Sequence, residues 1–245
     1  MLVTRASVPG ALRPHAMTTW PYTVPCVAEL AEHGWEFTAP VTVVVGENGS
    51  GKSTVVEALA EAFGLDAQGG RAGRKYGNNR PKTALGQVLR LDTTAEGARL
   101  RSGPRTKRRG FFLRAETAFG LMNAVSGRLG YWQADTDTMS HGEGFLTVFD
   151  EMFTGPGLYL MDEPEAALSF TSCLQLTALM HHLGTTGAQV ICATHSPILA
   201  ATPGADIIEV GDHGSRHVRW TELDLTAQWR RFLTDPAFYL HHLTK

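Results

Sequence analysis

A loop of nine consecutive residues has the residue types and the spacing to hold a chain of phosphates. Its members are Gly46, Glu47, Asn48, Gly49, Ser50, Gly51, Lys52, Ser53 and Thr54. They fit the pattern G-x-x-x-x-G-K-[ST], in which glycines let the backbone approach an anion closely. Lys52 would contact the β- and γ-phosphates as a point charge, and the Ser53 hydroxyl would bind Mg²⁺. The loop therefore predicts a site for a nucleotide with its magnesium ion.

The residues on either side of this loop predict the elements that must position it. Val41–Val45 is almost wholly apolar and β-branched, as expected of a buried strand in a parallel sheet. Val55–Phe63 has the composition of a helix, and Gly64 is suited to end it. The loop would then lie between a strand and a helix N-terminus, where backbone N–H groups and the helix dipole favour anions.

Two adjacent carboxylates follow a second apolar segment, Leu158–Met161. This segment predicts a buried strand, and the functional groups of open α/β sheets gather at the carboxyl ends of such strands. Asp162 would bind Mg²⁺ directly or through water, and Glu163 would accept a proton from the attacking water. Neighbouring carboxylates repel each other and stabilise a fold poorly. The alternative is an ordinary turn at a strand end, made with Pro164.

A histidine follows a third apolar segment. Gln189–Ala193 predicts a core strand, and the polar residues Thr194, His195 and Ser196 come directly after it. At the same sheet edge as the two carboxylates, the imidazole of His195 could hydrogen-bond a γ-phosphate. A single histidine is more often structural, but its place at a strand end favours the functional interpretation.

Basic residues are concentrated between residues 71 and 114. They are Arg71, Arg74, Lys75, Arg80, Lys82, Arg90, Arg99, Arg101, Arg105, Lys107, Arg108, Arg109 and Arg114. These are 13 of the 22 Lys and Arg residues, against two acids, so the formal balance is 13 − 2 = +11. Three interpretations stay open: a basic arm that binds nucleic-acid phosphate, a lid over the nucleotide, or a solvated loop.

Composition limits the size and the location of the protein. With 245 residues, 43% of them apolar, the chain can bury one core, or one core and a small lobe. The net charge of −2 does not indicate any particular class of binding partner. There is no apolar run of about 18 residues and no secretory signal. Three scattered cysteines fit reduced thiols, so we expect a cytoplasmic protein with no membrane segment.

The N-terminal third is less regular than the rest. Residues 1–19 are expected to be a leader, loose or disordered, because they are rich in Pro, Gly and Ala. Trp20–Pro25 predicts an edge strand, and Val27–His33 a short helix. Tyr22 could stack on adenine, or it could pack under the sheet. At the other end, an amphipathic helix is expected over residues 226–233, with residues 238–240 packed on the core.

The order of these motifs resembles that of the ABC-type ATPases, and most closely their soluble SMC/RecF-like branch, the bacterial "AAA family ATPases". The hallmarks are GENGSGKST at 46–54, GFFLRAE at 110–116, SHGE at 140–143, DEPEAALS at 162–169 and THSPIL at 194–199. The resemblance covers nearly the whole chain after residue 20. It implies an α/β fold of the P-loop NTPase type, with a doubly wound, mostly parallel sheet between helices and an N-terminal antiparallel β portion. One domain is expected over 20–245, with an inserted lobe at about 66–138.

The resemblance also implies residue roles. Ser140, Gly142 and Glu143 match the signature loop, which binds the nucleotide of the opposite subunit. His195 matches the switch histidine. Glu116 takes roughly the place of the Gln that transporter ATPases carry, and is a candidate Mg²⁺ ligand. The signature is Ser-His-Gly-Glu where transporter ATPases have Ser-Gly-Gly-Gln, and residues 170–172 depart from the Pro-Gln-Arg pattern.

The function implied by the resemblance is Mg²⁺-dependent ATP hydrolysis by a stand-alone head. The head would close as a head-to-tail homodimer around two ATPs and serve DNA repair, recombination or phage defence with an effector protein. No long heptad arms are present, and only 139 − 54 = 85 residues separate the loop from the signature. Two alternatives are the ATPase subunit of a membrane transporter and a nucleotide-gated switch with negligible turnover. Glu163 argues against the switch, which needs no base.

Overall fold

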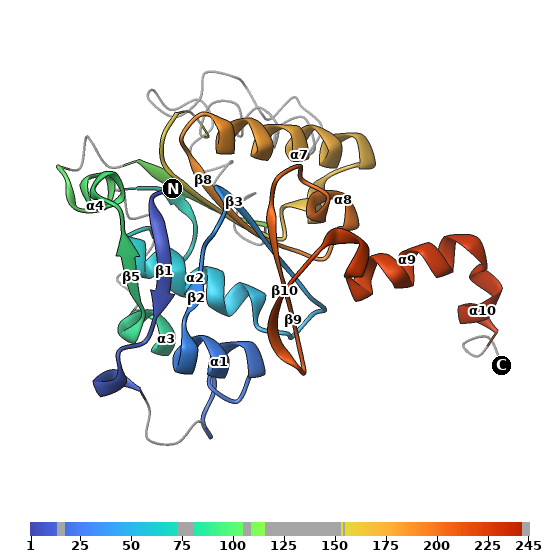
Figure 1. Ribbon diagram of the computed structural model, residues 1–245, viewed down its shortest axis with the longest axis horizontal. Helices are drawn as coiled ribbons and strands as arrows, with labels where there is room; N and C mark the ends of the chain where they lie inside the picture. The colour runs from blue at the N-terminus through green and yellow to red at the C-terminus, as the bar shows by residue number, and fades with distance from the viewer. Residues whose placement is uncertain (14–17, 73–80, 105–108, 116–152, 154, 242–245) are drawn as a thin grey trace.

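A seven-stranded sheet forms the centre of the computed structural model, which describes residues 1–13, 18–72, 81–104, 109–115, 153 and 155–241 (Figure 1). Its order is β10-β9-β3-β8-β7-β6-β4. The strands are β3 Val41–Val45, β4 Gly70–Arg71, β6 Gly110–Arg114, β7 Leu158–Asp162, β8 Gln189–Thr194, β9 Asp206–Gly211 and β10 Gly214–Val218. Strands β9, β3, β8, β7 and β6 run parallel, and β10 and β4 pair antiparallel at the edges. This confirms the expected mostly parallel α/β sheet.

Helices cover both faces of this sheet, which is why its central strands are apolar on both sides. Helix α2, Lys52–Phe63, packs on one face through residues such as Val55 and Leu59. Helix α7, Phe170–Thr185, packs on the other through Leu176 and Met180, and the short helix α8, Pro197–Ala200, packs against α7 (Figure 1). A 3-10 helix, Pro164–Ala167, connects β7 to α7.

A second, antiparallel sheet of order β2-β1-β5 confirms the expected N-terminal β portion. Its strands are β1 Val3–Ser7, β2 Trp35–Glu36 and β5 Arg90–Thr93. The expectation of a loose leader is therefore wrong for residues 3–7. Leu2 and Val3 are buried, and the buried Gln189 side chain bonds to their backbone. A 3-10 helix, Gly10–Leu12, follows β1.

Residues 81–104 are joined to this second sheet, although sequence predicts them as part of an inserted lobe. Helix α3, Ala84–Val88, packs on α2, and helix α4, Ala95–Ser102, follows β5. The rest of the expected lobe is β4 and β6, which belong to the central sheet, and residues outside the described part of the chain. Residues 116–152, which include the SHGE motif at 140–143, also lie outside the described part of the chain.

One predicted segment, close to residue 20, differs from the structure. Residues 18–23 form turns, and helix α1 spans Pro25–His33, so the edge strand predicted at 20–25 is wrong. Proline at the first position of α1 explains this, because its fixed φ suits a helix start. Tyr22 is only 6% exposed, which supports packing in the core over stacking on a base.

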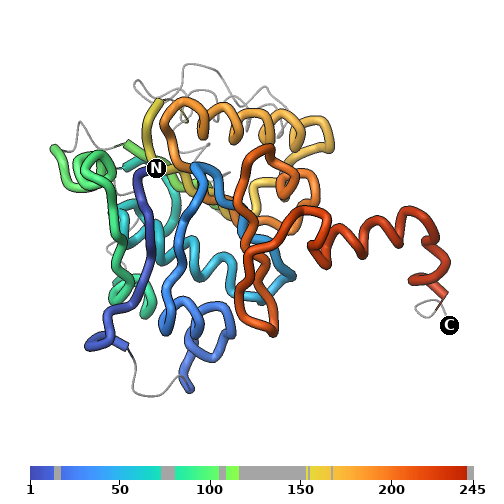
Figure 2. The backbone as a smooth tube through the Cα atoms, viewed as in Figure 1, coloured from blue at the N-terminus to red at the C-terminus, as the bar shows by residue number. Residues whose placement is uncertain are grey.

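The C-terminal helices extend away from the body of the molecule (Figure 2). They are α9, Asp224–Thr234, and α10, Pro236–Leu240, which follow a 3-10 helix at Trp220–Glu222. Phe238 is 48% exposed and contacts Tyr239 and the Arg231 guanidinium. The expectation that residues 238–240 pack on the core is therefore wrong, because these rings pack on their own helices.

The central strands bring their carboxyl ends to one edge of the sheet. In the strand register, Val45 at the end of β3 lies beside Thr194 at the end of β8. Asp162 at the end of β7 lies between Ala193 of β8 and Arg114 of β6. The glycine-rich loop, the two carboxylates and His195 therefore follow adjacent strand ends.

Candidate nucleotide-binding site

The glycine-rich loop needs glycine at particular positions. Gly49 and Gly51 have φ of 83° and 97°, in the left-handed region that other residues rarely adopt. At Gly46, a Cβ would lie 2.4 Å from the carbonyl oxygen of Val210. At Gly51, it would lie 2.8 Å from the Cys26 sulfur, so the loop is packed closely against its neighbours.

The buried Cys26 side chain contacts the backbone of the glycine-rich loop. Its thiol donates a hydrogen bond of 2.9 Å to the carbonyl oxygen of Ser50. Burial, with a smaller contribution from Glu29, raises the pKa of Cys26 to about 11. The thiol is therefore a neutral packing group that holds the loop backbone.

The loop presents unused polar groups to a ligand. Helix α2 begins at Lys52, and its N-cap residue Gly51 has no side chain to accept the first N–H groups. The Ser50 hydroxyl oxygen is buried and has no hydrogen-bond partner among the described residues. Glu47, Asn48 and Gly49 lie exposed at the tip. Thr54 is half-buried in the first turn of α2. This arrangement suits an anion at the helix N-terminus.

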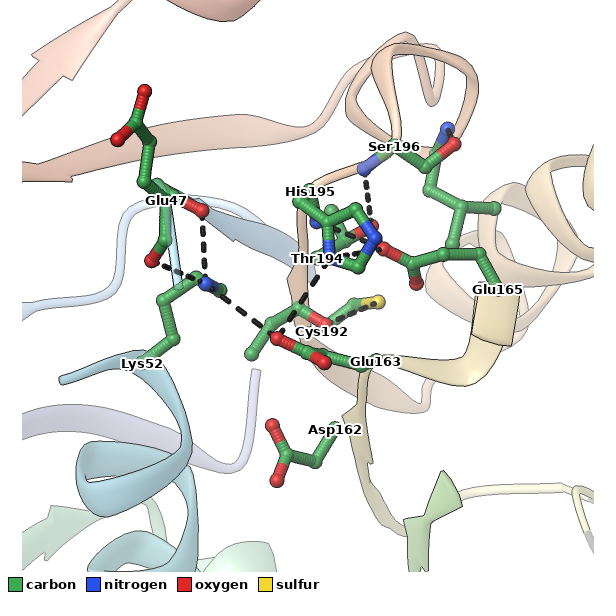
Figure 3. A network of polar contacts seen from close by, with 12 residues as sticks. Glu47, Lys52, Asp162, Glu163, Glu165, Cys192, Thr194, His195 and Ser196 are labelled. Atoms are coloured by element: carbon green, nitrogen blue, oxygen red, sulfur yellow. Dashed lines mark hydrogen bonds and ion pairs between the residues drawn. The ribbon is translucent and has the colours of Figure 1, made fainter. Parts of the chain in front are cut away.

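Lys52 crosses the mouth of the loop. Its ammonium group donates hydrogen bonds to the carbonyl oxygens of Gly46 at 2.8 Å and Glu47 at 2.9 Å (Figure 3). It also lies 3.6 Å from Glu163 Oε1. The Lys52 side chain is only 3% exposed, so its charge is fixed in place at the loop rather than solvated. A phosphate entering the loop would meet this charge.

Ser53 and Asp162 meet where the sequence predicts a magnesium ion. The Ser53 hydroxyl donates a hydrogen bond of 2.9 Å to Asp162 Oδ1. Both groups are oxygen ligands, which Mg²⁺ prefers, and Mg²⁺ usually takes only one or two protein ligands beside phosphates and water. The pair therefore fits the ion. No cluster of three or more His, Cys, Asp or Glu residues that could hold a metal occurs among the described residues.

Glu163 has a strained backbone. Its φ of 50° and ψ of 49° place it in the left-handed region, the only such non-glycine residue in the described part of the chain. Its N–H donates to the carbonyl oxygen of Ala193 at 2.9 Å, which holds it against β8. Strain of this kind costs of order 1–3 kcal/mol and is concentrated at functional sites. The side chain is 31% exposed, so water can reach the carboxylate.

His195 lies between two carboxylates. Its Nδ1 is 3.7 Å from Glu163 Oε1 and 3.5 Å from Glu165 Oε1 (Figure 3). The structure thus brings together Lys52, Glu163 and His195, which the sequence analysis assigned to one site. Ser53 and Asp162 lie beside them.

Two further residues of the site were not assigned from sequence. Arg114 was counted in the basic stretch, but its Nε lies 3.8 Å from Asp162 Oδ2 and its Nη1 lies 3.6 Å from Glu57 Oε2. Its side chain is 17% exposed, so Arg114 belongs to the site and not to a basic surface. Its position in the sequence, at the end of the apolar strand β6, could have indicated that Arg114 lies at the site. Glu165 belongs to the DEPEAALS motif at 162–169, but the sequence assigns it no role of its own.

A groove of about 490 Å³ runs along the outer side of the loop. Its walls are the loop, the start of α1, the turn between β9 and β10, and α9. The polar side chains of Asp212, His213 and Gln228 line it. The volume is within the usual range for a small-molecule site.

Four predicted site residues lie outside the described part of the chain: Glu116, Ser140, Gly142 and Glu143. Their assignments stay predictions. Within the described residues, no helix is both long enough and apolar enough to cross a membrane.

Comparison with known proteins gives partial matches. Residues 32–114 match the family model of an AAA domain. The chain is 24% identical over 236 residues to ABC transporter G family member 21 of Dictyostelium discoideum, covering 83% of this chain and 16% of that protein. It is 25% identical over 180 residues to ABC transporter G family member 11 of Arabidopsis thaliana, covering 67% and 25%. The chain thus spans a quarter or less of these curated relatives.

Two solved structures are similar at low identity. The SMC head domain from Thermotoga maritima matches with a TM-score of 0.45 and 17% identity, over 76% of this chain and 92% of that one. An ATP-binding subunit of an ABC transporter matches with a TM-score of 0.43 and 20% identity, over 74% and 79%. The AAA-domain match covers the part of the chain that contains strand β3, the glycine-rich loop and helix α2, so this segment is similar to AAA domains.

Proposed function

We propose that the protein binds ATP with Mg²⁺ at the loop and hydrolyses the bond to the γ-phosphate. The observation that carries this proposal is the contact between Lys52 and Glu163 across the mouth of the loop, 3.6 Å from Nζ to Oε1. A buried ammonium group at a helix N-terminus suits phosphate, and a partly exposed carboxylate beside it suits a water molecule.

Each residue has one task in this proposal. The N–H groups of the first turn of α2 and the Lys52 ammonium bind the phosphates. Ser53 and Asp162 would hold Mg²⁺, which when bound neutralises phosphate charge. Arg114 keeps a positive charge next to the Asp162 carboxylate. Glu163 accepts the proton of the attacking water, and His195 contacts the γ-phosphate. The nucleoside would lie in the groove beside the loop.

Binding is tested with Lys52→Ala. Because the variant lacks the ammonium group that bonds to the loop carbonyls of Gly46 and Glu47, ATP affinity should fall severely while the fold is kept. Lys82→Ala removes an exposed lysine and is the matched control. Calorimetric titration with ATP-Mg measures both. Near-normal ATP affinity in folded Lys52→Ala protein would rule out the assigned role.

Hydrolysis is tested with Glu163→Gln. Removing the base should lower the rate of phosphate release by about 10²–10⁴, the usual worth of general-base catalysis. ATP should still bind, since Lys52 and the loop are intact. Glu32→Gln, at an exposed surface glutamate, should leave turnover unchanged. A Glu163→Gln variant with full turnover would refute the assignment of the base.

The wider role is also a proposal. We infer a cytoplasmic head that closes as a head-to-tail homodimer around two ATPs and acts with an effector protein in DNA repair or phage defence. Sedimentation of Glu163→Gln with ATP-Mg tests the dimer, which fails if only monomers form. The names of the curated relatives favour the alternative of a transporter ATPase. Co-purification with a membrane subunit would support that alternative.

A further inference from the structure

Glu165 makes several contacts that the proposed reaction does not use. It lies in the 3-10 helix after β7, and its side chain is only 8% exposed. Its Oε1 accepts a hydrogen bond from the Thr194 hydroxyl at 2.5 Å and another from the His195 N–H at 2.8 Å. Glu165 therefore connects the segment after β7 to the end of β8, through the Thr194 hydroxyl and the backbone N–H of His195.

The hydroxyl of Thr194 takes part in two hydrogen bonds, one as a donor and one as an acceptor. Its oxygen accepts the N–H of Ser196 at 2.9 Å, so its one hydrogen is free to donate to Glu165. The Ser196 hydroxyl in turn caps α8. Glu165 thus anchors the whole turn from Thr194 to the start of α8, and His195 is the exposed residue of that turn.

The two carboxylates that face His195 differ in their surroundings. Glu163 is 31% exposed and is also paired with Lys52 at 3.6 Å. Glu165 is buried, and no ion pair in the described part of the chain joins it to a lysine or an arginine. Its second oxygen, Oε2, is buried without a hydrogen-bond partner among the described residues. The imidazole of His195 is therefore the ring that Glu165 faces, whereas Glu163 faces both this ring and the ammonium group of Lys52.

We propose that Glu165 is a positioning residue that holds His195 for the reaction and leaves Glu163 free to act as the base. This rests on the proposed ATP hydrolysis. Both carboxylates that face Nδ1 are acceptors, at 3.7 and 3.5 Å, so their position favours the Nδ1–H tautomer of a neutral imidazole and leaves Nε2 for the nucleotide. Without Glu165, Glu163 would be the only carboxylate that faces the His195 imidazole. A contact between Glu163 and the imidazole would then compete with the contact between Glu163 and the attacking water.

A double-mutant cycle tests whether Glu165 acts through His195. Glu165→Gln keeps the shape of the side chain and an acceptor oxygen, so the turn stays folded while the charge is lost. We expect kcat to fall by about 10- to 100-fold, the scale of a misplaced reacting group, with KM for ATP within about threefold. In a His195→Ala background, the same substitution should change kcat by less than about twofold.

Glu32→Gln is the matched control, because Glu32 is an exposed carboxylate 3.7 Å from the ring nitrogen of His33. It should change neither kcat nor KM. If Glu165→Gln lowers kcat equally in the His195→Ala background, or raises KM in step with the fall in kcat, the positioning role is overturned.

A second readout does not depend on turnover. In nucleotide-free protein, the ¹⁵N spectrum of the His195 ring should show the Nδ1–H tautomer, and Glu165→Met, which removes the acceptor oxygens, should shift the population towards Nε2–H. An unchanged tautomer in folded Glu165→Met protein would overturn the proposal even if ATP is hydrolysed. Absence of ATP hydrolysis by the unaltered protein would instead refute the proposed function and leave the tautomer result standing.

Discussion

Replacing Gln189 with methionine should destabilise the protein strongly, although Gln189 is far from the candidate site groups. The Gln189 side chain is fully buried at the start of β8. Its Oε1 accepts the N–H groups of Leu2 at 2.8 Å and Val3 at 2.7 Å, and its Nε2 donates to the Val3 carbonyl oxygen at 2.9 Å. Methionine has nearly the same length and shape but cannot make these bonds.

The expected loss follows from three orphaned backbone groups. Each buried N–H or C=O left without a partner costs about 1–3 kcal/mol, so three cost at least about 3 kcal/mol. Strand β1 could escape by detaching from the sheet. That would expose the buried side chains of Leu2 and Val3, at about 1.5–3 kcal/mol each, which again gives at least about 3 kcal/mol. Domains are stable by only about 5–15 kcal/mol.

Urea unfolding followed by circular dichroism measures this loss, and amide hydrogen exchange at Leu2 and Val3 shows where it arises. Both amides should lose protection in Gln189→Met. Gln87→Met is the control, because Gln87 is exposed and its amide donates a single bond to Lys82. A loss below about 1 kcal/mol with both amides still protected would refute the reasoning, since the three bonds would then carry no stability.

Three more outcomes are expected. Because burial raises its pKa to about 11, the Cys26 thiol should resist alkylation at pH 8 in the folded protein and react only on unfolding, as mass spectrometry would record. The hydrogen bond from Arg219 lowers the pKa of Glu222 to about 2, so its stabilising contribution is present above the ordinary value of 4.5 and is lost as pH falls towards 2. Glu222→Gln should thus be less stable than the unaltered protein at pH 7, with the difference vanishing near pH 2 in thermal unfolding scans. Neutralising the four cations at 105 and 107–109 should weaken DNA binding and flatten its salt dependence, with basal turnover little changed; unchanged binding would favour the solvated-loop interpretation.

Much of the site could be predicted because short-range patterns determine it. The glycine-rich loop carries its own conformation, and the apolar runs before it, before Asp162 and before His195 each form a buried strand. Parallel strands bring their carboxyl ends to one edge, so the three groups had to meet once the strands were recognised.

Other parts depend on contacts that no local pattern reveals. Strand β1 is short and flanked by residues typical of loops, and its anchor, Gln189, lies 186 positions from Val3. Arg114 lies in a stretch of the sequence that is rich in basic residues, which suggests a solvated loop. It is a site residue because β6 pairs with β7, which places Arg114 opposite Asp162. Glu165 reaches His195 only because the left-handed backbone at Glu163 turns the chain towards β8.

The position of β8 has a consequence for how the chain acquires its site. Strand β3, which leads into the loop, has only β8 and β9 as neighbours among the described strands, and both come late in the sequence. Chains emerge from the ribosome N-terminus first, and long-range strand pairing is slow. A nascent chain that ends before residue 189 has the loop but neither of the strands that pair with β3. If the loop binds ATP as proposed, ATP therefore stabilises the fold only after β8 and β9 have been synthesised, and it does not assist the earlier stages of folding.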